Sequence, residues 1–218
     1  LVSIAALRRR GFTPESLQMF IDLCGVSKSQ SSVDYAMLEY CIREDLKLKR
    51  PRMMAVLDPI RLIIDNYPEG ETEYLDVDNN LENPELGTRK VPFCRELYIE
   101  REDFMEEKVG KFFRLYPGNE VRLKGAYVVK CTGCVKDEAG RVTEILCTYD
   151  PDSRGGDPAD GRKVKSTIHW VDAENCFDAE VRLYSNLFDD PDPDAAGKDF
   201  LACLNPHSLE IRQGCKVE

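Results

Sequence analysis

Near the start of the chain, apolar residues recur with the spacing of an α-helix. Thr13 suits a helix N-cap with Pro14 in the first turn, and Gly25 suits the end of the same helix. Ser31 with Asp34 resembles a capping box for a second helix. The apolar faces of the two predicted helices carry Leu17, Phe20, Ile21 and Cys24 in the first, and Tyr35, Leu38 and Ile42 in the second.

Beyond residue 55 the pattern changes to short runs rich in β-branched and aromatic residues. A hairpin turn at 136–140 and a short helix at about 101–108 interrupt the series. Many short strands with turns between them favour antiparallel barrels over a parallel sheet. We therefore expect a mainly β fold with N-terminal helices. The predicted strands are 55–57, 60–64, 74–77, 96–99, 121–131, 145–149, 164–171 and 180–184.

One strongly basic stretch stands out at residues 108–130. It contains six lysines and arginines with a single acidic residue, Glu120, in a chain whose net charge is −10. Aromatic residues are interleaved with these cations, a combination that suits an RNA with unpaired bases. The alternative is a turn and a strand whose polar face happens to be basic, and composition alone favours that alternative. The aromatic residues are Phe112, Phe113, Tyr116 and Tyr127.

The same stretch contains a recognisable turn and strand. Pro117-Gly118-Asn119 predicts a tight turn, and Val121 and Leu123 then alternate with Arg122 and Lys124. We expect this turn to place Arg114 and Arg122 on either side of a hairpin-like bend. Guanidinium groups held by rigid elements suit the recognition of base edges.

Length and composition indicate a soluble globular protein. The 218 residues are enough for one large or two small domains, with 42% hydrophobic and 32% charged residues. The sequence contains neither an apolar run of membrane-spanning length nor a signal-peptide pattern at its start. Because the sequence opens at Leu1 without a methionine, we expect it to be part of a longer protein.

The cysteines predict thiols rather than metal ligands. Their number, nine, is odd and their spacing irregular, which favours reduced thiols in a cytosolic protein. The one CxxC motif, Cys131 with Cys134, lies in a predicted strand, far in sequence from His169 and His207. Zinc needs four ligands and a redox motif should open a helix, so we predict two ordinary strand thiols and no metal. The acidic run at 189–194 does not match a calcium loop, and no catalytic motif occurs.

Several segments resemble the glutaminyl-tRNA synthetase family, in the same order as in that family. The early ones read LRRRGFT at 7–13, CIREDL at 41–46 and RMMAVLDP at 52–59. The others are PELGTRKVPF at 84–93, CTYD at 147–150, DGRKVKSTIHWV at 160–171 and EVRLY at 180–184. Together they extend over essentially the whole chain.

The resemblance implies both an organisation and a role. Residues 1–50 would be the helical connector that follows the catalytic half, residues 51–100 with 178–218 the proximal β-barrel, and residues 101–177 the distal one. These barrels would bind the anticodon of the tRNA for glutamine. The parent enzyme would be a cytoplasmic monomer that joins glutamine to this tRNA with ATP and magnesium. This part would need no cofactor and would be inactive alone.

The resemblance also assigns individual residues. Arg52 matches an arginine at the middle anticodon base, Arg114 the arginine at the third base and Arg122 the one at the first base. Lys111 stands where some relatives have glutamine, and Lys124 where they have arginine; both keep hydrogen-bond donors at the anticodon. Residues near the inner corner of the L-shaped tRNA would be Ser27, Lys28, Ser29 and Gln30.

Two alternatives remain at this point. The related glutamate-specific synthetases have the same barrels, and the amino-acid pocket that separates the two enzymes belongs to the catalytic half. A ribosomal RNA-binding barrel protein, which has no enzymatic activity, is the other alternative. The helical connector disfavours that second alternative.

Overall fold

The computed structural model describes residues 3–28, 33–155, 157–193, 195 and 197–218. These residues belong to two compact units. The first unit comprises Leu1–Arg52 with Asp78–Gly87, and the second comprises Met53–Val77 with Thr88–Glu218. Among the described helices, none has the length and apolar character needed to cross a membrane.

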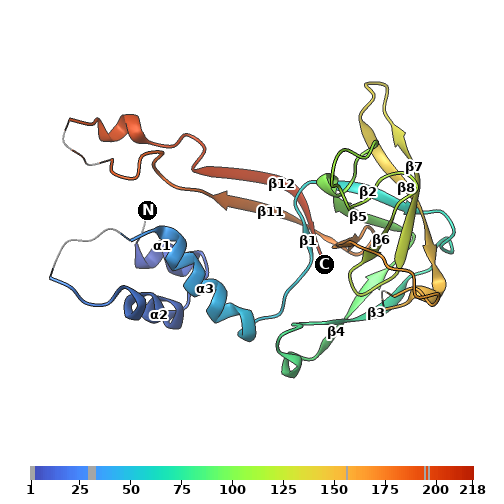
Figure 1. Cartoon of the computed structure of the whole chain (residues 1–218), viewed down its shortest axis with the longest axis horizontal. Helices are drawn as coiled ribbons and strands as arrows, with labels where there is room; N and C mark the ends of the chain where they lie inside the picture. Colours follow the sequence, from blue (N-terminus) through green and yellow to red (C-terminus); the bar gives the residue numbers. More distant parts are fainter. Residues whose placement is uncertain (1–2, 29–32, 156, 194, 196) are drawn as a thin grey trace. The chain divides into compact units, whose positions relative to one another are not determined.

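The first unit contains three helices: α1 (Ile4–Arg9), α2 (Pro14–Cys24) and α3 (Tyr35–Lys49) (Figure 1). The Thr13 side chain accepts a hydrogen bond from the Ser16 N–H at 3.1 Å, and Gly25 follows the last turn of α2, as predicted. Asp34 itself caps α3, whereas Ser31 lies outside the described residues. The small core of this unit consists of Leu7, Phe12 and Leu38.

The second unit is built on a seven-stranded sheet. Its strand order is β10-β5-β2-β8-β7-β6-β9. The strands are β2 (Pro59–Ile64), β5 (Glu96–Glu100), β6 (Glu120–Leu123), β7 (Val128–Lys136), β8 (Val142–Asp150), β9 (Thr167–Ile168) and β10 (Val171–Asp172).

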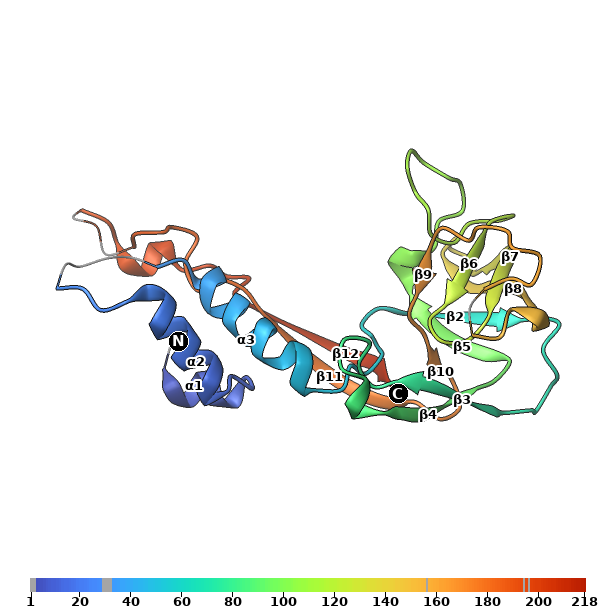
Figure 2. The same cartoon turned by 60° about the horizontal axis from the view of Figure 1, so that its bottom comes forward.

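This sheet is curled but not closed. Its edge strands β9 and β10 follow one another in the sequence, joined by His169 and Trp170, so the two edges approach each other (Figure 2). Each edge strand has only two residues, and in the described sheet β9 and β10 do not pair with each other. Two pairs, β2 with β8 and β6 with β9, are parallel.

These observations correct the expected fold. The mainly β class with N-terminal helices is confirmed, but the part of the chain that the structure describes contains no closed antiparallel barrel. Strands β2 and β8 are far apart in sequence and run in the same direction, and long connections of this kind permit parallel pairing. Edge strands of two residues are too short to close the sheet by hydrogen bonds.

Two smaller sheets complete the second unit. Strands β1 (Ala55–Val56), β12 (Leu209–Val217) and β11 (Phe177–Tyr184) form one, with β12 in the middle. Strands β3 (Glu73–Asp78) and β4 (Thr88–Phe93) form the other. We did not predict β4 or β12. Short 3₁₀ turns occur at Arg101–Asp103, Pro151–Ser153 and Phe200–Cys203 here, and at Pro84–Leu86 in the first unit.

The core of this unit follows the alternation of the strands. Along β2, buried residues alternate with partly exposed ones, as expected for a strand with one buried face. The fully buried Trp170 and Phe93 meet edge to face, with ring centroids 5.1 Å apart. The Trp170 indole N–H donates to the Lys124 carbonyl at 3.0 Å. Burial of these rings fixes the segment that links the two sheet edges.

Three predicted elements have different bounds in the structure. The strand predicted at 121–131 is two strands with a turn at Gly125, whose φ of +71° favours glycine, and a Cβ there would lie 3.1 Å from Val77. The helix predicted at 101–108 is one 3₁₀ turn, because Phe104 pairs with Leu115 instead. The strand predicted at 164–171 is reduced to β9 and the start of β10.

Candidate nucleic-acid interface

The basic stretch begins as an irregular segment between β5 and β6 that is fixed by backbone hydrogen bonds. The Leu115 N–H donates to the Asp103 carbonyl at 2.8 Å, and the Met105 N–H donates to the Leu115 carbonyl at 3.0 Å. Leu115 itself is fully buried. The Asn119 side chain donates to the Arg114 carbonyl at 2.7 Å. Hydrogen bonds therefore fix the backbone at Arg114 and at the next residue, Leu115.

The predicted turn at Pro117-Gly118-Asn119 is present. The Asn119 N–H donates to the Tyr116 carbonyl at 2.9 Å, and Gly118 has a φ of +88°. The Gly118 N–H also donates to the Cys131 carbonyl of β7 at 2.8 Å. The turn is thus attached to the sheet rather than projecting from it.

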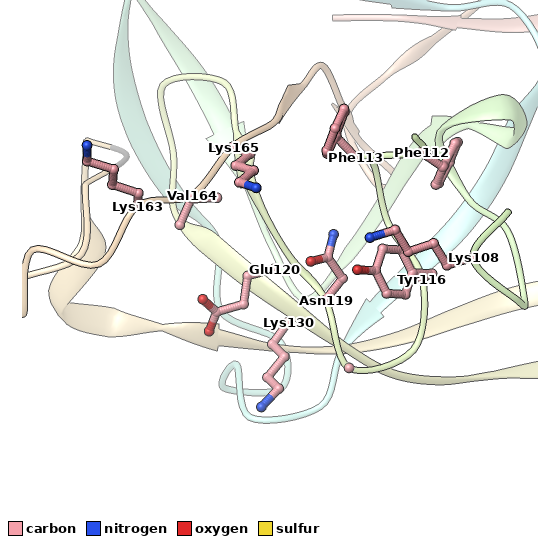
Figure 3. A pocket seen from close by; sticks show the side chains of 11 residues that line it. Lys108, Phe112, Phe113, Tyr116, Asn119, Glu120, Lys130, Lys163, Val164 and Lys165 are labelled. Atoms are coloured by element: carbon pink, nitrogen blue, oxygen red, sulfur yellow. The ribbon is translucent and has the colours of Figure 1, made fainter. Parts of the chain in front are cut away.

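A hollow of about 420 Å³ opens beside this turn (Figure 3). Its volume is within the range of sites for small organic groups. In Figure 3, Phe112, Phe113, Tyr116 and Lys108 lie to one side, Lys163 and Val164 to the other, with Lys165 between them. The remaining lining residues are Gly118, Asn119, Glu120 and Lys130.

The aromatic rings at the hollow lie close to cations. The Lys165 ammonium is 5.5 Å from the centroid of the Phe113 ring, and the Lys108 ammonium is 5.5 Å from that of Tyr116. Rings of this kind stack with unpaired bases, and ammonium groups neutralise phosphates. Of the aromatic residues predicted for this surface, Phe112, Phe113 and Tyr116 line one hollow, whereas Tyr127 is buried in the core.

Sequence reasoning placed Lys108 and Lys130 in the basic stretch but missed two other lysines that line this hollow. Lys163 and Lys165 come from the segment before β9. Their signal was the basic run from Arg162 to Lys165, which we read only as part of a family motif. Pairing of β6 with β9 brings that run beside the turn.

Arg162 holds the missed segment in place. It donates to Glu120 at 2.9 Å, to Asp150 at 2.8 Å and to Asp160 at 2.8 Å. These three carboxylates, Glu120 foremost, raise the pKa of the Arg162 guanidinium. The segment is thereby joined to β6 and β8, and its charge at this point is satisfied within the protein.

Arg114 and Arg122, predicted to contact the anticodon, are bound to different carboxylates. Arg114 Nη1 lies 2.7 Å from Asp103 and 3.1 Å from Glu102. Arg122 Nη2 lies 2.6 Å from Asp157, and its Nη1 donates to the Thr167 hydroxyl at 3.3 Å. The hydrogen bond with Glu102, and then the charge of Asp103, raise the pKa of Arg114.

Arg122 has the orientation that the sequence predicted. It projects from the polar side of β6, between Val121 and Leu123, both fully buried. Lys124 follows the end of β6 and is half-buried, whereas Lys111 is exposed. Within the described residues, the lining of the hollow includes none of these three side chains, nor Arg114.

The other predicted contacts belong to the first unit. Arg52 Nη2 lies 3.0 Å from Glu82, which is also 3.4 Å from Lys47. These cations, Arg52 foremost, lower the pKa of the Glu82 carboxyl. Ser27 and Lys28 are exposed beyond the end of α2. Ser29 and Gln30 lie outside the described residues.

The CxxC residues lie in β7. Cys131 is buried opposite Cys147 of β8, and Cys134 is partly buried opposite Ile145. Across the described part of the chain, no three His, Cys, Asp or Glu side chains gather as metal ligands would. The absence of zinc at this motif stays a prediction.

Comparison with known proteins identifies the family. Residues 51–150 match one model, and residues 167–218 a second, both described as the anticodon-binding domain of class I tRNA synthetases for glutamate and glutamine. Glutamine–tRNA ligase of Clostridium perfringens is 57% identical over 212 residues, and that of Bradyrhizobium diazoefficiens 54% over 216.

These alignments include 97% and 99% of this chain, but 38% of each relative. The ligase of Clostridioides difficile is 55% identical over 212 residues, again with 97% of this chain and 38% of its own length. The chain thus spans little more than a third of the relatives it matches. It belongs to the anticodon-binding domain family of the class I tRNA synthetases for glutamate and glutamine, and corresponds to that region of the glutamine–tRNA ligases.

Proposed function

We propose that this chain reads the anticodon of the tRNA for glutamine on behalf of a ligase that joins glutamine to that tRNA with ATP and Mg²⁺. The observation that carries the proposal is the basic surface around the hollow, in a chain of this family. An anticodon presents unpaired bases, which can be splayed apart and read individually. The chain supplies specificity, and the chemical step belongs to the rest of the parent protein.

The arginines have separate roles in this proposal. Arg52 reads the middle base, Arg114 the third and Arg122 the first, while Lys111 and Lys124 donate hydrogen bonds nearby. A wrong base leaves buried polar groups without partners, which costs more than the right base gains. Ser27, Lys28, Ser29 and Gln30 contact the inner corner of the tRNA.

The hollow takes one unstacked nucleotide of the anticodon loop. Phe113 and Tyr116 offer ring faces to the base, and Lys163 and Lys165 offer ammonium groups to the phosphates. Both contacts tolerate any base, so the hollow contributes affinity while the arginines contribute selectivity. The lysines that now lie over the rings exchange those contacts for phosphate when RNA binds.

The parent protein is a cytoplasmic monomer, and its anticodon region divides into residues 51–100 with 178–218 and residues 101–177. Glutamine rather than glutamate is its amino acid, because the three relatives compared are glutamine–tRNA ligases. The structural role of this chain would be the same in a glutamate enzyme.

Charging assays on the full-length protein test the proposal. Glutamine should be joined to its tRNA, and glutamate should not. Lys165→Ala should raise KM for the tRNA several-fold, because a phosphate contact is lost. Lys90→Ala is the matched control, since Lys90 is an exposed lysine of the same unit paired with Asp76 at 2.8 Å. Charging with glutamate, or equal effects of the two substitutions, would contradict the proposal.

A further inference from the structure

Asp103 is a carboxylate in an unusual place. Its side chain is 6% exposed, although it ends a short 3₁₀ turn at Arg101–Asp103 beside the basic stretch. Its carboxylate lies 2.7 Å from Arg114 Nη1, and its backbone carbonyl accepts from the Leu115 N–H at 2.8 Å. The same residue therefore holds both the guanidinium of Arg114 and the backbone next to it.

Burial of this charge costs the fold free energy. Loss of water is the largest influence on the Asp103 carboxyl and raises its pKa, while the charge of Arg114 acts in the opposite direction. His169 also lowers this pKa, whereas Glu102 and Glu100 raise it. A neutral side chain of the same size would be cheaper for the fold at neutral pH. The carboxylate at this position therefore calls for a role other than stability.

Glu102 contacts the same nitrogen of Arg114 but is a weak restraint. Its side chain is 77% exposed, and its oxygen lies 3.1 Å from Nη1. Exposed ion pairs of long side chains contribute little, because water and the flexibility of both chains compete with them. Asp103 is shorter, buried and closer to Arg114. It is the partner that restricts where the guanidinium can point.

Both carboxylates engage only one end of the guanidinium. Among the described residues, neither Nε nor Nη2 of Arg114 has a hydrogen-bond acceptor in the protein. These two nitrogens form one edge of the planar group, and their N–H bonds are parallel. Such an edge suits two adjacent acceptors on the edge of a nucleotide base. The Arg114 side chain is 44% exposed, so RNA can reach this residue.

We propose that Asp103 is the positioning residue for Arg114: it grips Nη1 and so aims the Nε–Nη2 edge at a base with two adjacent acceptors. The inference rests on the proposed function, in which Arg114 reads the third anticodon base. Asp103 touches no RNA in this arrangement. Its buried charge is kept because an arginine fixed before binding loses less conformational freedom when it meets the base.

The test uses the full-length enzyme and tRNAs that differ at the third anticodon base. In Asp103→Asn, the ratio of kcat/KM between the matched and altered tRNA should fall about tenfold, as for members of one hydrogen-bond network. In Glu102→Gln, the matched control, this ratio should change little. The melting temperature of Asp103→Asn should not fall, because the substitution removes a buried charge and leaves Arg114 accessible to water.

Two further variants separate positioning from a role in folding. In an Arg114→Ala background, Asp103→Asn should have no additional effect on the ratio. Arg114→Lys should lose discrimination between the matched and the altered tRNA, although it keeps a cation for Asp103, because lysine has no planar edge. If Asp103→Asn keeps full discrimination while Arg114→Ala loses it, the inference fails and the proposed function stands. If Arg114→Ala also keeps discrimination, the proposed role of Arg114 fails. Additive effects of the two substitutions, or full discrimination in Arg114→Lys, would also overturn the inference.

Discussion

Replacement of Arg122 by alanine should separate recognition from stability. Arg122 projects from the polar side of β6, and its side chain is 23% exposed. Its carboxylate partner, Asp157, is 91% exposed, so this ion pair contributes on the order of 1 kcal/mol or less to folding. The buried neighbours Val121 and Leu123 are left in place.

The expected loss in recognition is larger. By analogy with arginine contacts to bases in DNA, one good contact is worth about 1–3 kcal/mol of discrimination. This is roughly a 5- to 150-fold change in the preference for the matched base. Arg122→Ala should therefore lose discrimination at the first anticodon position and keep it at the third. Arg114→Ala should show the opposite pattern.

The assay is kcat/KM of the full-length enzyme for matched and anticodon-altered tRNAs, with Tm measured on the same samples. Arg61→Ala is the matched control, because Arg61 also projects from a strand, between the buried Ile60 and Leu62, and pairs with Glu96 and Glu144. It should lower stability to a similar extent without changing discrimination. If the Arg122→Ala enzyme charges every tRNA as the wild type does, or loses activity only through unfolding, the reasoning fails. The basic face of β6 is then an ordinary solvated surface.

Four further outcomes follow from the structure. The 218-residue chain alone should show neither aminoacylation nor ATP–pyrophosphate exchange, since its sequence has no nucleotide-binding motif. Detectable exchange would contradict the proposal that the chemical step belongs to the rest of the parent protein. Elemental analysis of the purified chain should find no stoichiometric zinc, because Cys131 and Cys134 lack two further ligands. Hydrogen bonds from Lys49 and then Thr13 lower the pKa of the Asp45 carboxyl. The ionised carboxylate therefore stabilises the helical unit at pH values above the ordinary pKa of 3.8, and this stabilisation is lost as the pH falls through the lowered pKa. Asp45→Asn should therefore lower the Tm of the helical unit at pH 7 by a few degrees. Equal Tm values for the variant and the wild type at this pH would refute this expectation. Leu97→Ala should reduce the free energy of unfolding by about 2–5 kcal/mol in denaturant titrations, because Leu97 is fully buried, and an unchanged midpoint would contradict that packing.

Local chemistry explains which parts of the fold were predictable. Thr13, Gly25 and the turn at Gly118 were read correctly, because caps and turns depend on residues a few positions apart. The break at Gly125 was missed, although a glycine is itself a local turn signal and this one has a positive φ. The helix predicted at 101–108 was wrong for a non-local reason, because a long-range pairing with Leu115 took its place.

The candidate site divides in the same way. The alternation that exposes Arg122 is a local property of β6 and was predicted from sequence. The contact of Arg122 with Asp157, 35 positions away, depends on tertiary structure and has no sequence signature. The contribution of Lys163 and Lys165 to the hollow depends likewise on the pairing of β9 with β6. Patterns identified which side chains were available, and the tertiary structure decided which came together.

The most direct test of the central claim is the rate at which the wild-type full-length enzyme charges tRNA for glutamine altered at one anticodon position at a time. If this region reads the anticodon, each change should lower kcat/KM by roughly 5- to 150-fold, the range for loss of one specific base contact. Changes outside the anticodon loop, the inner corner and the acceptor end should have little effect. Equal kcat/KM for the matched tRNA and all three altered ones would contradict the account.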